Sequence, residues 1–282
     1  MIVVTGPTGQ LGTAFGRLLE GREVRNLSET ELDFKHLEEI PRALAAIGPS
    51  MVINCAAYTA VDAAEEDEGT ARIVNATAVG ALAAACADIG ARFVTFSTDY
   101  VFDGTSADGY VESDRPNPMS AYGRTKLEGE RLALDRNPDA LVVRTSWLLS
   151  GTHANFAATM IELISRGPVR VVDDQRGRPT LVDDLARATV DAVGRGATGI
   201  LHLANEGITT WYGLAREIAS VAGLDPERVT PCSTDEFPRP APRPADSVLN
   251  SERVAELGID PMPPYQASLA AAVKQLLDAD LA

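Results

Sequence analysis

Apolar runs alternate with helical patterns through the first half of the chain. Mostly apolar runs predict strands at 1–5, 51–57, 91–96 and 140–145, and a mixed run at 22–27 adds a fifth. Helical patterns fill the intervals, at 10–19, 37–47, 70–90 and 122–135. Continuous apolar strands are typical of a parallel sheet that is covered on both faces. The alternation therefore predicts an α/β fold with a doubly wound parallel sheet.

The alternation of predicted strands and helices becomes less regular after residue 150. Shorter elements follow: helices at 154–166, 181–193, 210–222 and 265–277, and strands at 169–172 and 200–203. Residues 173–180 read as a polar loop, and 237–244 as an extended, Pro-rich and basic stretch. We expect this part to form a smaller C-terminal lobe over the sheet edge where open α/β folds bind their ligands.

A glycine-rich turn joins the first strand to the first helix. Gly6, Gly9 and Gly12 follow the strand at the spacing G-x-x-G-x-x-G. Glycines there allow a tight turn and a close backbone approach to a pyrophosphate at the helix N-terminus. An ordinary strand-to-helix turn is the alternative. The context predicts a Rossmann-type NAD(P)-binding domain at 1–150. Residues 151–282 would then be mainly a substrate-binding lobe, with some segments returning to the first domain.

The end of the second strand bears on the choice of cofactor. It carries Asn26-Leu27-Ser28, whereas an acidic residue there would favour NAD. A small polar residue can accept a 2′-phosphate, so we expect NADPH, with NADH possible. Asp33 and Phe34 form a candidate adenine contact, and a helix cap is the alternative role for Asp33.

Tyr122 and Lys126 lie four residues apart in a predicted helix and therefore on one helix face. A phenol loses its proton near pH 10. A nearby ammonium stabilises the phenolate and lowers the pKa of the phenol, so Tyr122 becomes a candidate proton donor for a carbonyl. Thr98 ends a predicted strand and presents a hydroxyl to the same crevice. A solvated helix face is the alternative reading of the pair.

Composition narrows the function classes. The formal net charge of −15 argues against nucleic acid or an anionic membrane as partner. Cys55, Cys86 and Cys232 show no paired spacing, so we expect thiols in a reducing compartment. We see no secretory signal and no long uncharged apolar segment, and we expect a cytoplasmic protein. The three histidines are scattered, so we predict no metal site.

The glycine fingerprint, Thr98 and the Tyr122/Lys126 pair occur in the order of the extended short-chain dehydrogenase/reductases, which the whole chain resembles. Seven segments narrow the resemblance to the dTDP-4-dehydrorhamnose reductase family: 9–12, 54–62, 96–104, 144–147, 155–156, 174–180 and 242–244. That family reduces the 4-keto group of dTDP-4-dehydro-L-rhamnose with NADPH or NADH to give dTDP-L-rhamnose. The implied partner is therefore a dTDP-4-keto-6-deoxyhexose, bound by a monomer or a homodimer.

The resemblance also implies roles for individual residues. Tyr122 would donate the proton, Lys126 would lower its pKa and hold the nicotinamide ribose, and Thr98 would hydrogen-bond the developing alkoxide. Asp99 would bind the sugar, with Trp147 as a flat wall beside it. Asn155 and Arg243 would contact the thymidine diphosphate. The implied cofactor contacts are Gly6, Thr8, Gly9, Gln10, Leu11, Gly12, Asp33, Phe34, Ala56, Ala57, Tyr58, Thr59 and Phe96, together with Tyr122 and Lys126.

Several alternatives stay open. Trp147 could be a core residue, and Arg243 a surface residue. Leu148-Leu149-Ser150-Gly151 departs from the family pattern on the sugar side, which leaves room for a reductase of another dTDP-4-keto-6-deoxysugar. A dehydratase would need a second carboxylate after Thr98, but Tyr100 follows Asp99. A C4 epimerase would use the same Thr, Tyr and Lys, and a non-catalytic NADP-binding regulatory subunit would share the fold.

Overall fold

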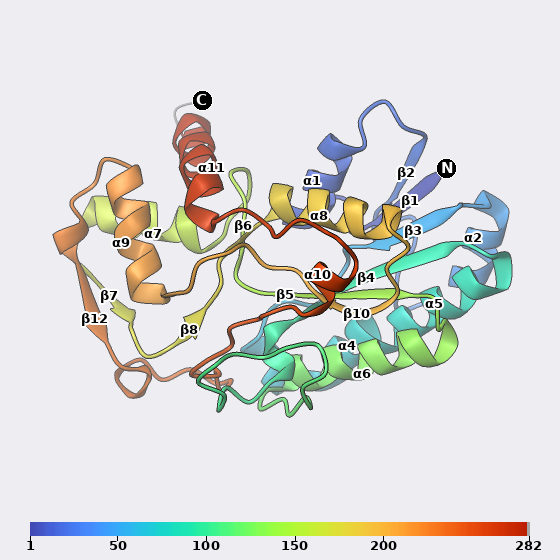
Figure 1. Cartoon of the computed structure of the whole chain (residues 1–282), viewed down its shortest axis with the longest axis horizontal. Helices are drawn as coiled ribbons and strands as arrows, with labels where there is room; N and C mark the ends of the chain where they lie inside the picture. Colours follow the sequence, from blue (N-terminus) through green and yellow to red (C-terminus); the bar gives the residue numbers. More distant parts are fainter. Residues whose placement is uncertain (281–282) are drawn as a thin grey trace.

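Six parallel strands form the central sheet, in the order β10-β5-β4-β3-β1-β2 (Figure 1). The structure is a computed structural model and describes residues 1–280. The strands are β1 (Ile2–Thr5), β2 (Val24–Leu27), β3 (Met51–Asn54), β4 (Arg92–Thr98), β5 (Leu141–Thr145) and β10 (Gly199–His202). Because the strand order reverses beside β1, the carboxyl ends of β1 and β3 frame a crevice of the kind that binds ligands. The predicted doubly wound α/β fold is confirmed.

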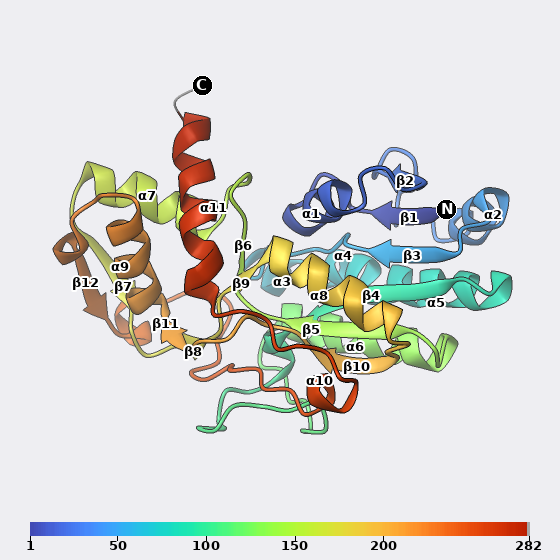
Figure 2. The same cartoon turned by 45° about the horizontal axis from the view of Figure 1, so that its top comes forward.

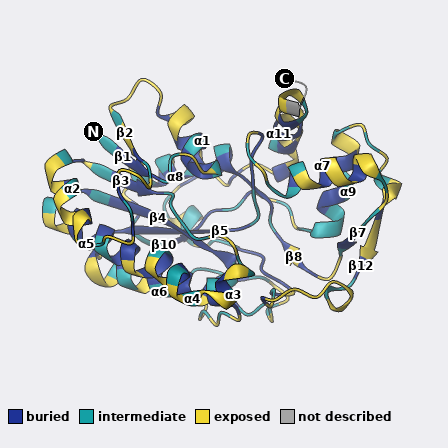
Figure 3. Cartoon of the chain, turned by 180° about the vertical axis from the view of Figure 1, so that it is seen from behind, coloured by how far each residue is buried: buried dark blue, intermediate teal, exposed yellow. Residues whose placement is uncertain are grey.

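Helices cover both faces of the sheet (Figure 2). Helices α1 (Gln10–Leu18) and α8 (Val182–Gly194) pack together on one face, and α2 (Glu39–Ile47), α5 (Ala78–Ile89) and α6 (Ala121–Arg136) cover the other. Val3 and Val4 show the division, since each is fully buried but in a different apolar cluster. Successive strand side chains point to opposite faces, so a strand buried on both sides is expected to be largely apolar. Figure 3 shows this buried band.

A chain of buried polar side chains crosses the sheet near its carboxyl edge. Thr5 donates to Asn54 at 2.6 Å, and Asn54 donates to Thr95 at 3.1 Å. Buried polar groups are costly unless paired, so these bonds tie β1, β3 and β4 together in one register. The edge that carries the predicted site is thereby held at a fixed spacing.

The long predicted helix at 70–90 is interrupted. It consists of α4 (Glu68–Arg72), a π-helical turn at Ile73–Thr77 and α5. Asn75 lies in that turn and exchanges two hydrogen bonds with the backbone of Tyr58, at 2.9 and 3.0 Å. By length and composition Glu68–Ile89 could cross a membrane. A core helix passes the same test, and here 56% of the apolar window is buried against the sheet and α6.

The C-terminal lobe contains α7 (Phe156–Arg166), α9 (Trp211–Val221) and α11 (Tyr265–Asp280). Three small sheets join it together: β7 (Val169–Val172) with β12 (Val229–Cys232), β8 (Arg176–Gly177) with β11 (Thr209–Thr210), and β6 (Leu148–Leu149) with β9 (Thr180–Leu181). The short helices α3 (Ala63–Glu66) and α10 (Arg253–Glu256) complete the set of α-helices in residues 1–280. Strand β10 and helix α8 lie beyond residue 150 yet belong to the central sheet and its cover.

The polar loop predicted at 173–180 is wrong in part. It contains β8 and the first residue of β9, and each of these strands is only two residues long. Their partners lie far away in sequence, at β11 and β6. Strands this short carry no periodic signal, because the neighbouring chain decides whether they pair.

Candidate active site

Helix α6 begins at the carboxyl edge of β4 and places Tyr122 there. Ser120 caps the helix, since its hydroxyl accepts a hydrogen bond from the Gly123 amide at 3.1 Å. The ring of Tyr122 meets the edge of Tyr100, with ring centroids 5.9 Å apart. Tyr58 and Tyr122 also pack against one apolar cluster that includes Ala121. Tyr122 is therefore held within the crevice and not on a solvated helix face.

Thr98 is the last residue of β4 and lies beside Tyr122. Its hydroxyl donates to Asp99 Oδ1 at 3.0 Å and accepts from the Tyr100 amide at 3.2 Å. Burial raises the pKa of Tyr122 to about 12, and a hydrogen bond with Thr98 opposes this. The net pKa of Tyr122 is therefore raised and not lowered, because desolvation of the phenolate dominates, and the predicted lowering contribution of Lys126 stays a prediction.

Lys126 is buried one turn after Tyr122. Its Nζ donates to the carbonyl oxygen of Phe96 at 2.6 Å. Burial lowers the pKa of Lys126 to about 8, while the nearby carboxylate of Glu130 raises it. At neutral pH the side chain is therefore an ammonium, but one that titrates far more easily than an exposed lysine.

Asp99 is buried beside Thr98, and its Oδ2 has no hydrogen-bond partner within residues 1–280. Burial raises its pKa to about 6, and side-chain hydrogen bonds with Ser247 and Thr98 oppose this rise. The role of Asp99 as a sugar contact stays a prediction.

The glycine fingerprint closes tightly on the sheet. Gly6 has φ of 63°, and a Cβ there would lie 2.7 Å from the Ala56 amide nitrogen. A Cβ on Gly12 would fall on the carbonyl oxygen of Gly6. Only glycine fits at either position. The two glycines therefore let the turn pack closely on itself and on the end of β3, which sets the N-terminus of α1 at the sheet edge where a pyrophosphate can bind.

A pocket of about 490 Å³ lies beside this turn, at the ends of β1, β2 and β3. Eight predicted cofactor residues line it: Gly6, Thr8, Gly9, Asp33, Phe34, Ala56, Ala57 and Tyr58. The other predicted cofactor residues do not line this pocket. Gln10, Leu11 and Gly12 lie in α1, Thr59 is exposed, and the carbonyl oxygen of Phe96 accepts a hydrogen bond from Lys126. Lys35 also lines the pocket and was missed, although it directly follows the predicted pair Asp33 and Phe34.

Trp147 stands two residues beyond β5, where Thr145 pairs with Thr98 in the sheet register. Its indole stacks on Trp211, with centroids 3.7 Å apart and planes 9° from parallel. Trp211 begins α9 and was not among the predicted site residues. A lone aromatic residue at a helix start gives no local signal of such a contact.

Asn155 and Arg243 are already engaged by protein groups. Asn155 caps α7 by accepting from two amides, and its amide nitrogen donates to Ser150 and to Gln10. Arg243 makes a bidentate pair with Asp62, at 2.6 and 2.9 Å. The predicted contacts of Asn155 and Arg243 with a nucleotide remain predictions. In the structure, Asn155 hydrogen-bonds Gln10 and Arg243 hydrogen-bonds Asp62, so each residue links two segments that are distant in the sequence.

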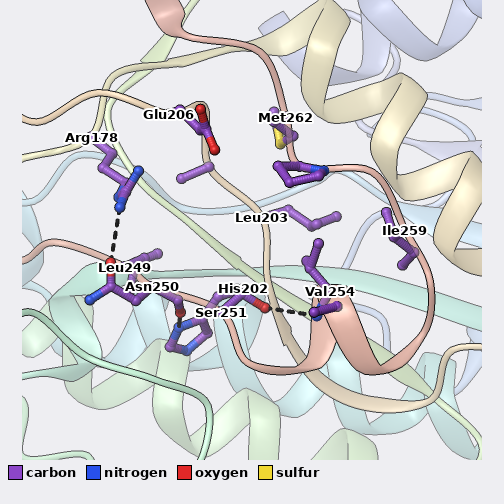
Figure 4. A pocket seen from close by; sticks show the side chains of 13 residues that line it. Arg178, His202, Leu203, Glu206, Leu249, Asn250, Ser251, Val254, Ile259 and Met262 are labelled. Atoms are coloured by element: carbon purple, nitrogen blue, oxygen red, sulfur yellow. Dashed lines mark hydrogen bonds between the residues drawn. The ribbon is translucent and has the colours of Figure 1, made fainter.

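A second pocket, of about 310 Å³, lies between the end of β10 and α10 (Figure 4). Arg178 donates to Asn250 at 2.9 Å on one side, and Leu203, Val254 and Ile259 form an apolar side. None of the predicted site residues lines it. Within residues 1–280, no three His, Cys, Asp or Glu side chains gather in a way that could hold a metal ion.

The chain matches the RmlD substrate binding domain family over residues 1–278. It is 42% identical over 281 residues to a dTDP-4-dehydrorhamnose reductase of Mycobacterium tuberculosis, covering 96% of this chain and 92% of that protein. It is 43% identical over 284 residues to a Streptomyces antibioticus protein named probable dTDP-4,6-dihydroxy-2-methyloxan-3-one 4-ketoreductase, with coverages of 99% and 96%.

The fold is similar to that of the solved dTDP-4-dehydrorhamnose reductase of Bacillus anthracis in complex with NADP. The TM-score is 0.91 at 32% identity, and the match covers 99% of this chain and 98% of that one. The resemblance inferred from the seven segments is therefore confirmed. The chain belongs to the RmlD substrate binding domain family, together with its dTDP-4-dehydrorhamnose reductase relatives.

Proposed function

We propose that this protein is an NADPH-dependent oxidoreductase that reduces the 4-keto group of dTDP-4-dehydro-L-rhamnose to give dTDP-L-rhamnose. The observation that carries the proposal is the grouping of Thr98, Tyr122 and Lys126 at the carboxyl end of β4. Family membership and the names of the relatives support the substrate class, a dTDP-4-keto sugar. The NADP complex of the Bacillus anthracis relative supports the cofactor.

Three side chains would carry out the proton transfer of this reaction. When bound, NADPH supplies the hydride for C4 of the sugar. Tyr122 gives its phenolic proton to the C4 oxygen, and its raised pKa keeps that proton in place throughout the physiological range. Thr98 hydrogen-bonds the oxygen as charge develops on it. The ammonium of Lys126 stabilises the phenolate left after transfer.

The glycine turn and the pocket beside it suit the cofactor. Gly6 and Gly12 keep the turn compact at the N-terminus of α1, where the pyrophosphate would bind, and the 490 Å³ pocket has room for an adenosine. Lys35 is the only cation among the described residues that line this pocket, and it would face a 2′-phosphate. We therefore favour NADPH over NADH. Residues 1–150 would hold the cofactor, and the C-terminal lobe would hold the sugar nucleotide.

Asp99 and Trp147 are the proposed sugar contacts. The carboxylate of Asp99, directly after β4, would accept a hydrogen bond from a sugar hydroxyl. Trp147 would cover the apolar edge around the 6-methyl group. Asn155 and Arg243 would act chiefly by holding the loops around the nucleotide, because their polar groups are already bonded.

A second candidate is a 4-ketoreductase for another dTDP-4-keto-6-deoxysugar. Two observations favour keeping it: the Leu148-Leu149-Ser150-Gly151 segment on the sugar side, and the relative named as a 4-ketoreductase at 43% identity. Both candidates share the hydride and proton chemistry and differ in the sugar that meets Tyr122.

Enzymatically generated dTDP-4-dehydro-L-rhamnose tests the proposal, with NADPH consumption followed by the absorbance of the reduced nicotinamide. We expect turnover, and a loss of about 10²- to 10⁴-fold in kcat with Tyr122→Phe. Tyr212→Phe, which removes a hydroxyl from a tyrosine on α9, is the matched control.

Each alternative gives its own result in this assay. NADPH binding without oxidation would point to a regulatory subunit. Conversion of the sugar without net NADPH consumption would point to an epimerase. If turnover occurs, the product configuration at C4, determined by NMR, separates rhamnose from its sister sugars.

A further inference from the structure

The backbone of Trp147 adopts an unusual conformation. Its φ is 48°, which makes it the only non-glycine residue with positive φ in the described chain. Bulky side chains avoid this region, so such a residue persists only where its surroundings determine it. The Trp147 carbonyl accepts from the Thr180 amide at 3.1 Å, and the β6–β9 pairing begins at the next residue. The backbone is thus fixed on its C-terminal side.

The indole ring is fixed separately, by two neighbours that lie over it. Trp211 covers one face, with the near-parallel stack described above, and Phe156 supports Trp211 at a centroid distance of 4.5 Å. Gly177 lies over the ring near Cε2. A Cβ on Gly177 would lie 2.5 Å from Cε2 and 2.8 Å from Nε1 of Trp147. Gly177 has no positive φ, so the ring, and not the backbone, requires a glycine here.

One small sheet brings both supports together. Gly177 on β8 pairs with Thr209 on β11, and Trp211 follows two residues later as the first residue of α9. The Thr210 side chain caps α9 and also donates to Asp173 at 2.6 Å. The position of Trp147 is therefore set by the β8–β11 pair of the C-terminal lobe, although Trp147 itself follows a strand of the central sheet.

We propose that Trp211 and Gly177 are positioning residues that hold Trp147 against the deoxyhexose and thereby set sugar affinity. The proposal rests on the proposed function, because it takes the exposed part of the half-buried Trp147 as the sugar contact. Neither residue would touch the reacting atoms. Loss of either would let the ring turn, which weakens the contact with the sugar and leaves the nucleotide and cofactor contacts unchanged.

The test compares binding of dTDP-L-rhamnose with binding of dTDP, by calorimetry and without turnover. Trp211→Leu and Gly177→Ala should each weaken dTDP-L-rhamnose binding roughly three- to tenfold, the range expected for one lost aromatic contact. The affinity for dTDP should not change, and Trp211→Phe should recover part of the loss. Matched controls are Tyr212→Leu, one residue further along α9, and Gly194→Ala, where a Cβ meets nothing.

A spectroscopic arm reports on the stack itself. These are the only two tryptophans of the chain, and stacked indoles couple their transitions to give a paired circular dichroism band. The band should disappear in Trp147→Phe and in Trp211→Phe alike. If Trp211→Leu does not fold, Gly177→Ala and Trp211→Phe carry the test.

Two results would overturn the proposal. One is a folded Gly177→Ala or Trp211→Leu protein that binds dTDP-L-rhamnose as tightly as the unchanged protein. The other is an unchanged protein that lacks the coupled band or prefers dTDP to dTDP-L-rhamnose. Failure of the unchanged protein to reduce the keto-sugar would instead overturn the proposed function, while the binding comparison still decides the role of the two residues.

Discussion

Lys126 determines how the site responds to alkaline pH. The pKa of Lys126 is about 8 and that of Tyr122 is about 12, so Lys126 loses its proton first as the pH rises. Raising the pH past 8 removes the ammonium while Tyr122 stays protonated. We expect kcat/KM for the keto-sugar to fall above about pH 8, as the pH profile would show. Lys126→Arg, which keeps its charge, should move the fall to higher pH. A flat wild-type profile up to pH 10 would contradict the assignment.

Lys35 is the residue on which cofactor preference should depend. Lys35→Glu should raise KM for NADPH roughly ten- to a hundredfold, the cost of losing one hydrogen bond to a charged group. KM for NADH should change little, because NADH lacks the 2′-phosphate. Initial rates with the two cofactors measure both values. Lys274→Glu on α11 makes the same change of charge at an exposed position and is the control.

At the scale of elements, a buried ion pair joins α6 to β5. Arg144 donates to both carboxylate oxygens of Glu130, at 2.9 and 2.7 Å, and both side chains are almost fully buried. Glu130→Gln would leave the Arg144 charge unpaired. We expect the free energy of unfolding to fall by about 3–5 kcal/mol in denaturant titrations. Glu162→Gln breaks the exposed pair with Arg166 and should cost less than about 1 kcal/mol. Equal losses would argue against a buried pair.

The elements also show what the sequence could predict. Strands β1, β3, β4 and β5 are mostly apolar and were found because burial on both faces favours apolar side chains. Thr98, Tyr122 and the glycine turn were found because their chemistry requires a local spacing. Trp211, Gly177 and Lys35 were not, since their roles arise from contacts between distant segments. The rise of the Tyr122 pKa was not predicted, because it comes from burial of the phenol, and burial depends on the whole fold.

At the scale of the molecule, the Asp62–Arg243 pair ties the segment after Tyr58 to the Pro-rich stretch of the C-terminal part. The Arg243 charge also acts on Tyr100 and opposes the rise of its pKa that burial causes, and the Tyr100 ring lies against Tyr122. Asp62→Asn should lower the free energy of unfolding by about 1–2 kcal/mol, as a partly exposed charged hydrogen bond implies. Hydrogen exchange should rise at 241–250. Arg239→Gln, which lies 3.9 Å from Asp62, is the control and should have little effect.

The late position of α8 and β10 in the sequence has a consequence for folding during translation. Thr98, Tyr122 and Lys126 are all synthesised before residue 130, yet β5 gains its outer neighbour only at Gly199–His202. Until then the face of the sheet that α8 covers stays open to water on the ribosome. The catalytic half therefore cannot finish folding as an independent unit during translation. A ribosome-bound fragment that stops before residue 199 should remain sensitive to protease, and the full chain should unfold in one transition.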